Sequence, residues 1–259
     1  MTSDTRADKR RRQKELSKRG DAVLKSGLPK SASLDDLEAA SAVLAAAMDD
    51  PVGAAAKVQA AFDAAAMLHA PLSKLACKKG CGYCCYGIVM VSAPEAFRLA
   101  AWLHARGANA VQRFREAAVG PAGKTAKQRH GAKLPCPLLQ DGACSAYASR
   151  PLACRTVTAF ELQPCIDEFE GREGDILVPT HYTAHAGNAQ MAFAAALTLT
   201  GHPVAYYELS AAVTRVLDTT DAAARWRQGD DIFAGVLQDQ DGVAEIAGAA
   251  RAIAAAVTA

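Results

Sequence analysis

Apolar residues near the start of the chain recur at the spacing of an amphipathic helix. Leu34, Leu37, Leu44 and Met48 are separated by steps of three, seven and four residues, which places their side chains on one helical face. Ser33 comes directly before them, and a serine in that position can cap the first free backbone N–H groups of a helix. The pattern predicts a helix that begins at Ser33.

A second helix is expected immediately afterwards. Asp50 can cap it, Pro51 suits its first position, and it would run to about Ala70, where Pro71 stops it. Two helices with so short a connection favour an antiparallel pair. Residues 31–72 are therefore interpreted as a helical hairpin.

The middle and the end of the chain also carry helix signals. Ser92 and Glu95 have the spacing of a capping box, which predicts a helix that ends near Gly107. Residues 87–91 are β-prone, and residues 120–135, rich in Gly, Lys and small side chains, are expected to be a mobile loop. Alanine-rich helices are expected at Tyr182–Thr200, Val204–Asp218, Asp221–Leu237 (with a break at Gly229) and Val243–Val257.

Composition strengthens the helical interpretation. Alanine is abundant and aromatic residues make up only 6% of the chain, and alanine loses no side-chain entropy in a helix. The predicted fold class is mainly α, with helices packed around a loop-rich cysteine module that binds metal. That module is expected at residues 73–178, between the hairpin and a C-terminal helical region at 179–259. Residues 1–30 read as a basic flexible arm.

Charge and hydropathy exclude several classes of protein. The net charge of +2 is too small to indicate nucleic acid as a partner. No apolar run approaches the roughly 18 residues of a membrane span. The charged N-terminal stretch lacks the apolar core of a secretory signal, so a cytoplasmic location is expected. In that reducing compartment, clustered thiols favour metal ligands or redox groups over disulfides.

The first cysteine group is Cys77, Cys81, Cys84 and Cys85, four thiols within nine residues. Gly80 and its neighbours permit the tight turn needed to aim several sulfurs at one point. Thiolates are soft ligands that suit zinc, cuprous copper or iron–sulfur clusters. The group therefore predicts a metal site and leaves the metal open.

A second group follows after 50 intervening residues, as Cys136, Cys144, Cys154 and Cys165, each beside a turn former or a basic residue. We expect the two groups to converge on one site or on two adjacent sites. Clustered thiolates repel one another, so cationic neighbours should lower their pKa values. Arg150 and Arg155 are the expected cofactor-facing cations, because a guanidinium stays charged and can bind sulfur or neighbouring carbonyls. His181 and His185, four residues apart, are a weaker metal pair, and capping or surface roles explain them better.

The two groups together resemble the YkgJ-type cysteine-cluster family, described as a zinc- or iron-chelating domain. Its signature is a Cys-x-x-(x)-Cys-x-x-Cys-Cys group followed by Cys-Pro, Gly-x-Cys-x-x-Tyr and Arg-Pro-x-x-Cys-Arg. All these elements occur here between Cys77 and Arg155, and the resemblance covers roughly residues 75 to 165. Similar modules occur in flagellin lysine N-methylases, where the cluster is thought to be iron–sulfur. The resemblance thus implies an iron–sulfur cofactor.

Function is expected to follow from that module. The favoured hypothesis is an iron–sulfur cluster of the 4Fe–4S type, held by Cys77, Cys81, Cys84 or Cys85 and at least one downstream cysteine. Its role would be electron transfer, redox sensing or support of an activity that modifies a protein partner. One alternative is a zinc or copper module without redox turnover, in which eight thiols could form two tetrahedral sites. Another is a protein-modifying enzyme related to the methylases, for which no catalytic residue is identified.

Overall fold

The computed structural model describes residue 7 and residues 34–69, 75–238 and 240–258. The expected basic arm at residues 1–30 and the Ser33 cap therefore lie outside the described residues. Helices dominate and strands are short, so the expected mainly α fold is confirmed. None of the described helices is both long and apolar enough to cross a membrane.

The chain divides into two compact units that are not consecutive in sequence. Among the described residues, one contains 34–69, 184–204 and 241–258, and the other contains 75–183, 205–238 and 240. The expected C-terminal helical region at residues 179–259 thus contributes to both units. Each unit is described separately below.

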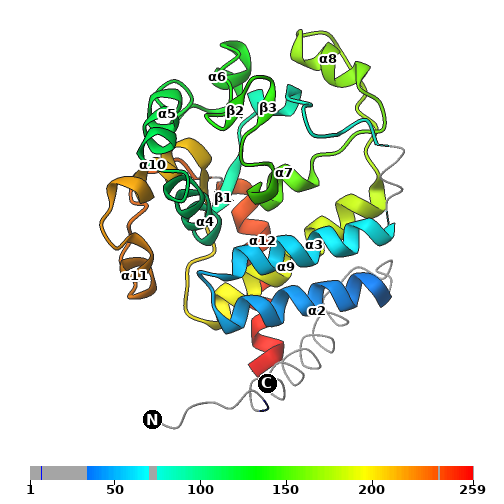
Figure 1. Ribbon diagram of the computed structural model, residues 1–259. Helices are drawn as coiled ribbons and strands as arrows, with labels where there is room; N and C mark the ends of the chain where they lie inside the picture. The colour runs from blue at the N-terminus through cyan, green and yellow to red at the C-terminus, as the bar shows by residue number, and fades with distance from the viewer. Residues whose placement is uncertain (1–6, 8–33, 70–74, 239, 259) are drawn as a thin grey trace. The chain divides into compact units, whose positions relative to one another are not determined.

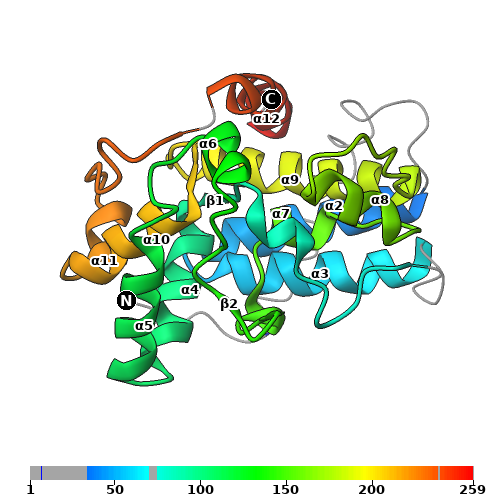
Figure 2. The same cartoon turned by 90° about the horizontal axis from the view of Figure 1, so that it is seen from above.

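The first unit is helical, and α2 (Leu34–Asp49) and α3 (Ala54–His69) lie side by side within it (Figures 1 and 2). The predicted hairpin is therefore present, but its second helix begins three residues later than expected. Pro51–Gly53 form a turn in which the Asp50 carboxylate accepts the N–H of Val52 at 3.1 Å. The other helices of this unit are α9 (Thr180–Leu199), apart from its first residues, and α12 (Gln240–Thr258).

Helix α9 packs on α3 through a buried ring pair. The rings of Phe62 and His185 are stacked, with centroids 5.4 Å apart, and both side chains are buried. His185 is therefore part of the core of the first unit. The side chain of His181 lies outside the described residues, so the histidine pair is not tested.

The second unit is organised around one short antiparallel pair, β1 (Met90–Ser92) with β4 (Tyr206–Glu208). Of its helices, α4 (Ala93–His104) and α10 (Leu209–Asp218) contact that pair. Helix α5 (Ala108–Ala118) packs on both of them and α11 (Ala222–Arg227) packs on α4 (Figure 1). The predicted capping box is confirmed, because the N–H of Ser92 donates to Glu95 Oε2 at 3.0 Å. Gly107, with φ of 87°, follows the end of α4 as expected.

Two predicted helices are wrong in part. Tyr206–Glu208 form a strand rather than the start of a helix, because all three residues are buried and pair with β1. Alanine-poor sequence and two tyrosines suit a strand better than a helix. The expected Asp221–Leu237 helix ends at Arg227, and Gly229 has a φ of 97°. The predicted break there is confirmed, and a turn rather than a helix follows to residue 237.

The cysteine region consists of short elements joined by turns. These elements are η2 (Tyr83–Tyr86), α6 (Ala126–Gly131), β2 (Leu139–Gln140), β3 (Ala143–Cys144), η3 (Tyr147–Ser149), α7 (Leu152–Thr156) and α8 (Gln163–Phe169). Residues 120–135, expected to be a mobile loop, contain the helix α6. Thr125 and Gln128 form a capping box that starts α6, and Arg129 in this helix is buried.

Candidate metal centre

The first cysteine group forms a tight turn followed by one 3-10 turn. The N–H of Cys81 donates to the carbonyl of Lys78 at 3.0 Å, and Gly80 between them has a φ of 97° that favours glycine. The N–H of Cys85 then donates to the carbonyl of Gly82 at 3.0 Å. These two consecutive turns fold the segment that carries the four thiols of the group.

The second group begins on a small hairpin of β2 and β3. Residues 141 and 142 form its turn with φ of 50° and 73°, and Cys144 pairs with Leu139 across it. The N–H of Ser145 returns to the carbonyl of Leu138 at 2.8 Å. The hairpin therefore turns the chain back, and Cys144 on its second strand lines the same cavity as Cys136, which comes three residues before its first strand.

The two groups are joined directly through the backbone. The N–H of Cys136 donates to the carbonyl of Cys85 at 2.7 Å. Gly82 lies against the hairpin so closely that an added Cβ would be 3.1 Å from a side-chain carbon of Leu139 and 3.2 Å from the carbonyl oxygen of Gly142. Such contacts are tighter than ordinary van der Waals packing, so a side chain at residue 82 would require the hairpin to shift by a few tenths of an ångström. The two groups therefore lie together as expected, and their roles as metal ligands stay a prediction.

Two cavities with shared walls collect all eight cysteines. The smaller, of about 50 Å³, is lined by six of them: Cys81, Cys84, Cys85, Cys136, Cys144 and Cys154. The larger, of about 280 Å³, is lined by Cys77, Cys81, Cys84 and Cys165. Cys81 and Cys84 thus line both. Within the described residues, no three His, Cys, Asp or Glu side chains are grouped tightly enough to hold a single metal ion.

The two predicted arginines have different surroundings. Arg150 lines the smaller cavity, its guanidinium lies 3.7 Å from the centre of the Tyr147 ring, and its Nε donates to the Tyr147 carbonyl at 3.2 Å. Arg155 is buried and donates to the carbonyls of Arg150 and Ala148 at 2.8 and 2.7 Å. Arg155 therefore holds the backbone around Arg150, whereas Arg150 itself faces the thiols. Lys78 and Lys79 are exposed and line neither cavity.

Burial controls the acidity of most of these thiols. It raises the pKa of Cys136 to about 12 and also raises the pKa of Cys154 well above its ordinary value, with neighbouring thiols adding to the effect. Arg150 acts in the opposite direction on Cys144 and Cys154. Cys84 differs from them, because a hydrogen bond with Cys85 lowers its pKa to about 7, with Arg150 contributing. The same hydrogen bond raises the pKa of Cys85.

A buried carboxylate fixes the segment that carries Cys154. Glu95, at the start of α4, accepts the N–H of Leu152 at 2.6 Å with one oxygen and the N–H of Ser92 with the other. Leu152 is the first residue of α7, which contains Cys154. The capping-box residue of α4 therefore also anchors the N-terminus of α7, and burial should strengthen both bonds.

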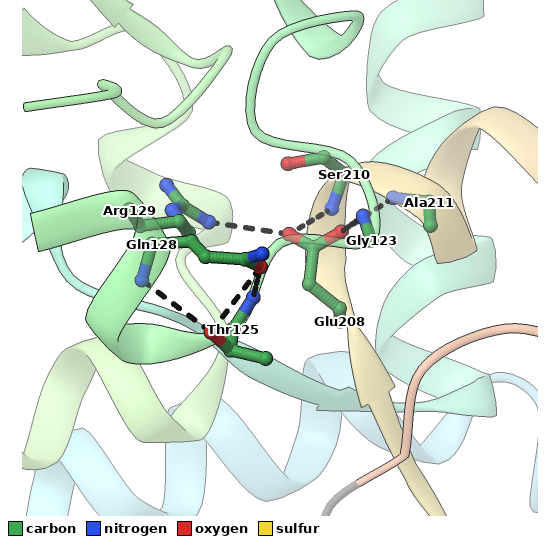
Figure 3. Close-up of polar contacts among 7 residues, drawn as sticks. All are labelled: Gly123, Thr125, Gln128, Arg129, Glu208, Ser210 and Ala211. Carbon is green, nitrogen blue, oxygen red and sulfur yellow. Dashed lines mark hydrogen bonds and ion pairs between the residues drawn. The ribbon is translucent and has the colours of Figure 1, made fainter. Parts of the chain in front are cut away.

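The sequence did not point to a second buried carboxylate and its partner. Glu208 and Arg129 form an ion pair at 3.2 Å, and their side chains are 0% and 1% exposed (Figure 3). The Thr125–Gln128 spacing was a usable signal for α6, which carries Arg129, since it has the capping-box form recognised at Ser92. Nothing in the local sequence indicated that this arginine would be buried. His130 was likewise given no role, and it lines the larger cavity.

The cavities, the thiols and the buried cations define a metal-binding class of domain. Residues 76–174 match the family model "CxxCxxCC: Putative zinc- or iron-chelating domain". This region, which includes all eight cysteines, is a cysteine-cluster domain, and the match supports metal binding by it. The match covers less than half of the chain. Neither the curated proteins nor the solved structures gave a significant match.

Proposed function

We propose that the cysteine-cluster domain carries an iron–sulfur cluster, with 4Fe–4S favoured, and that it acts as a redox or supporting component for a protein partner. The observation that carries the proposal is the set of six cysteines, from three separate segments, around the smaller cavity. The ligands would include Cys81 or Cys84 from the first group and at least one of Cys136, Cys144 and Cys154. Cys77 and Cys165 would be auxiliary ligands from the larger cavity.

The chemistry of the donors supports this proposal. Each iron of a cluster takes its own thiolate, so thiols spread around a cavity suit a cluster better than they suit one ion. Binding must displace thiol protons, and the raised pKa values of Cys136 and Cys154 mean that metal, rather than solvent, would drive that step. Arg150 supplies a fixed positive charge beside the resulting thiolates.

The redox or supporting role rests on the position of Cys84. This thiol is exposed and lines both cavities, so a cluster held near it would lie close to solvent. Electron exchange with another protein requires a cluster near the surface. A purely structural metal site does not require such access to solvent.

The proposal is tested on the full chain purified without oxygen. Iron and acid-labile sulfide in equal amounts, a brown colour and a paramagnetic signal on reduction are expected. A colourless protein with stoichiometric zinc would replace it with the second candidate, a zinc module, which the matched family description also names. A protein that takes up neither metal on reconstitution would contradict both.

The ligand assignment is tested separately with serine variants. Loss of iron in Cys136→Ser together with retention in Cys165→Ser would support the smaller cavity as the cluster site. The reverse pattern would move the cluster to the larger cavity.

A further inference from the structure

The Glu208 carboxylate accepts four hydrogen bonds. Its two oxygens accept the backbone N–H groups of Ser210 and Ala211 at 2.9 and 2.8 Å, at the start of α10, and that of Gly123 at 3.3 Å. Arg129 donates to it at 3.2 Å (Figure 3). The carboxylate therefore joins three segments: β4 with α10, the turn at Gly123, and α6. With four donors, its charge is well satisfied.

Arg129 is satisfied far less completely. Only its Nη1 has a partner, and its Nε and Nη2 are buried without any hydrogen-bond acceptor in the described part of the chain. The side chain is 1% exposed. Buried donors of a charged group are costly to leave unpaired. The Nε and Nη2 donors of Arg129, and its positive charge, are therefore available to a group other than Glu208.

The pair lies next to the smaller cavity. Leu209, the residue after Glu208, lines that cavity together with Cys136. On the other side, the N–H of Leu134 donates to the carbonyl of Arg129 at 3.0 Å, which folds the chain back just before Cys136. Cys136 is the most buried of the eight thiols. Burial raises its pKa, and among nearby charges Arg129 opposes that rise more than Glu208 adds to it.

We propose that Arg129 is a positioning residue for the metal centre, which stabilises the negatively charged thiolates around Cys136 from behind the cavity wall. Glu208 fixes the guanidinium in place. The inference rests on the proposed metal-binding function but not on the identity of the metal. It distinguishes two cations: Arg150 faces the cavity directly, and Arg129 acts through the buried interior, where solvent screens charge least.

The test compares Arg129→Gln with Arg129→Lys in the metal-loaded full chain. Both substitutions remove the guanidinium, but only glutamine removes the charge. We measure the rate at which each protein loses metal to excess chelator, and the midpoint potential if the metal is a cluster. Glutamine should speed metal loss roughly tenfold, the size expected for one unit charge nearby in a protein interior. It should also shift the potential negative, while lysine stays within about threefold of the parent.

Two further variants separate charge from folding. Arg225→Gln is the matched control, because Arg225 is an exposed arginine whose Nε donates to Asp230 at 2.8 Å; it should behave as the parent. The double variant Arg129→Gln with Glu208→Gln removes the buried negative charge that the single variant leaves without its cationic partner. It should still lose metal faster than the parent.

The outcomes are distinguishable. Equal metal loss in the lysine and glutamine variants, or full recovery in the double variant, would mean that the pair only maintains the fold, and the inference would be overturned. Parent-like behaviour of all Arg129 variants would overturn it as well. The metal content of the parent is measured first, so a parent that binds no metal identifies a failure of the proposed function itself.

Discussion

The two cavities of the cysteine domain are both lined by cysteine thiols, but the other residues around those thiols differ. The wall of the smaller cavity includes the buried residues Val89, Leu138 and Leu209, together with Cys136, which is 8% exposed. The wall of the larger cavity includes the exposed residues His130, Val157 and Glu168. A thiolate at Cys136 is therefore costly to form, whereas Cys84, which lines both cavities, is exposed. The difference indicates that buried cations matter for one cavity and solvent access for the other.

The hydrogen bonds at the thiols follow the same division. In the larger cavity, Cys77 accepts the N–H of Ala159 at 3.3 Å, and Cys165 contacts the carbonyl of Glu161 at 3.9 Å. Around the smaller cavity, Arg150, Arg155 and Glu95 order the surrounding backbone. A cofactor in the smaller cavity would meet a preorganised wall, and that arrangement generally reduces the reorganisation needed on binding.

The largest expected effect comes from replacing one sulfur atom by oxygen in each cavity. Cys136→Ser should remove most of the bound metal and lower the melting temperature of the loaded protein by at least about 5 °C, since roughly 2 kcal/mol or more of binding energy is lost. Cys165→Ser should retain most of the bound metal and a melting temperature close to that of the parent. Metal analysis and thermal unfolding of the two variants check this. Matching losses would show that the cavities form one functional site.

The next effect compares the two arginines predicted from the sequence. Arg150→Ala should speed metal loss roughly tenfold, because the removed charge faces the thiols. Arg155→Ala should lower the free energy of unfolding by about 2 kcal/mol, because buried carbonyls lose charged donors. Chelator competition and denaturant unfolding measure these separately. If Arg155→Ala had the larger effect on metal loss without destabilising the protein, the assigned roles would be reversed.

A third prediction concerns pH in the metal-free protein. The thiolate is the reactive form, and the hydrogen bond with Cys85 lowers the pKa of Cys84 to about 7. Alkylation of Cys84 should therefore increase through about pH 7, whereas the raised pKa of Cys136, about 12, keeps that thiol unreactive until far higher pH. Mass spectrometry of labelled peptides resolves the two. In Cys85→Ser, a midpoint that stays near 7 would argue against the hydrogen bond as the cause.

The smallest effect tests the contact between the two cysteine groups. Gly82→Ala should cost about 1 kcal/mol of stability, because the new Cβ meets Leu139 and the Gly142 carbonyl. Gly131→Ala is the matched control, since a Cβ there meets nothing within 4 Å and alanine favours a helix. Opposite signs in the two variants, measured by urea unfolding, are expected. A neutral Gly82→Ala would mean that the hairpin can move away without loss.

Local signals predicted the elements that local forces determine. The Ser92 capping box, the break at Gly229 and the α2–α3 hairpin all follow from residues within one or two turns of one another. The strand at Tyr206–Glu208 does not, because its stability comes from pairing with β1, more than a hundred residues earlier. Helix periodicity alone cannot reveal such a partner.

The candidate site shows the same limit. The cysteines could be recognised from their density in the sequence, and Arg150 from its place beside them. Arg129 could not, because its role depends on burial against Glu208, 79 residues away. At least one of Arg150 and Arg155 was expected to face the site. Arg150 lines the smaller cavity, and Arg155 donates to the carbonyls of Arg150 and Ala148. Charge near a cysteine in sequence does not establish which way a side chain points.

The discontinuous order of the two units has a consequence for synthesis on the ribosome. All the cysteines have been synthesised by residue 183. Strand β1 can pair only after β4 has been made, and the wall of the smaller cavity is complete only after Leu209 has been made. Until those residues are made, the nascent thiols have an unfinished wall and are open to premature metals or oxidants. Long-range closure of this kind is slow compared with local folding. Faithful loading of the domain would therefore be a late event, following translation of α10 rather than of the last cysteine.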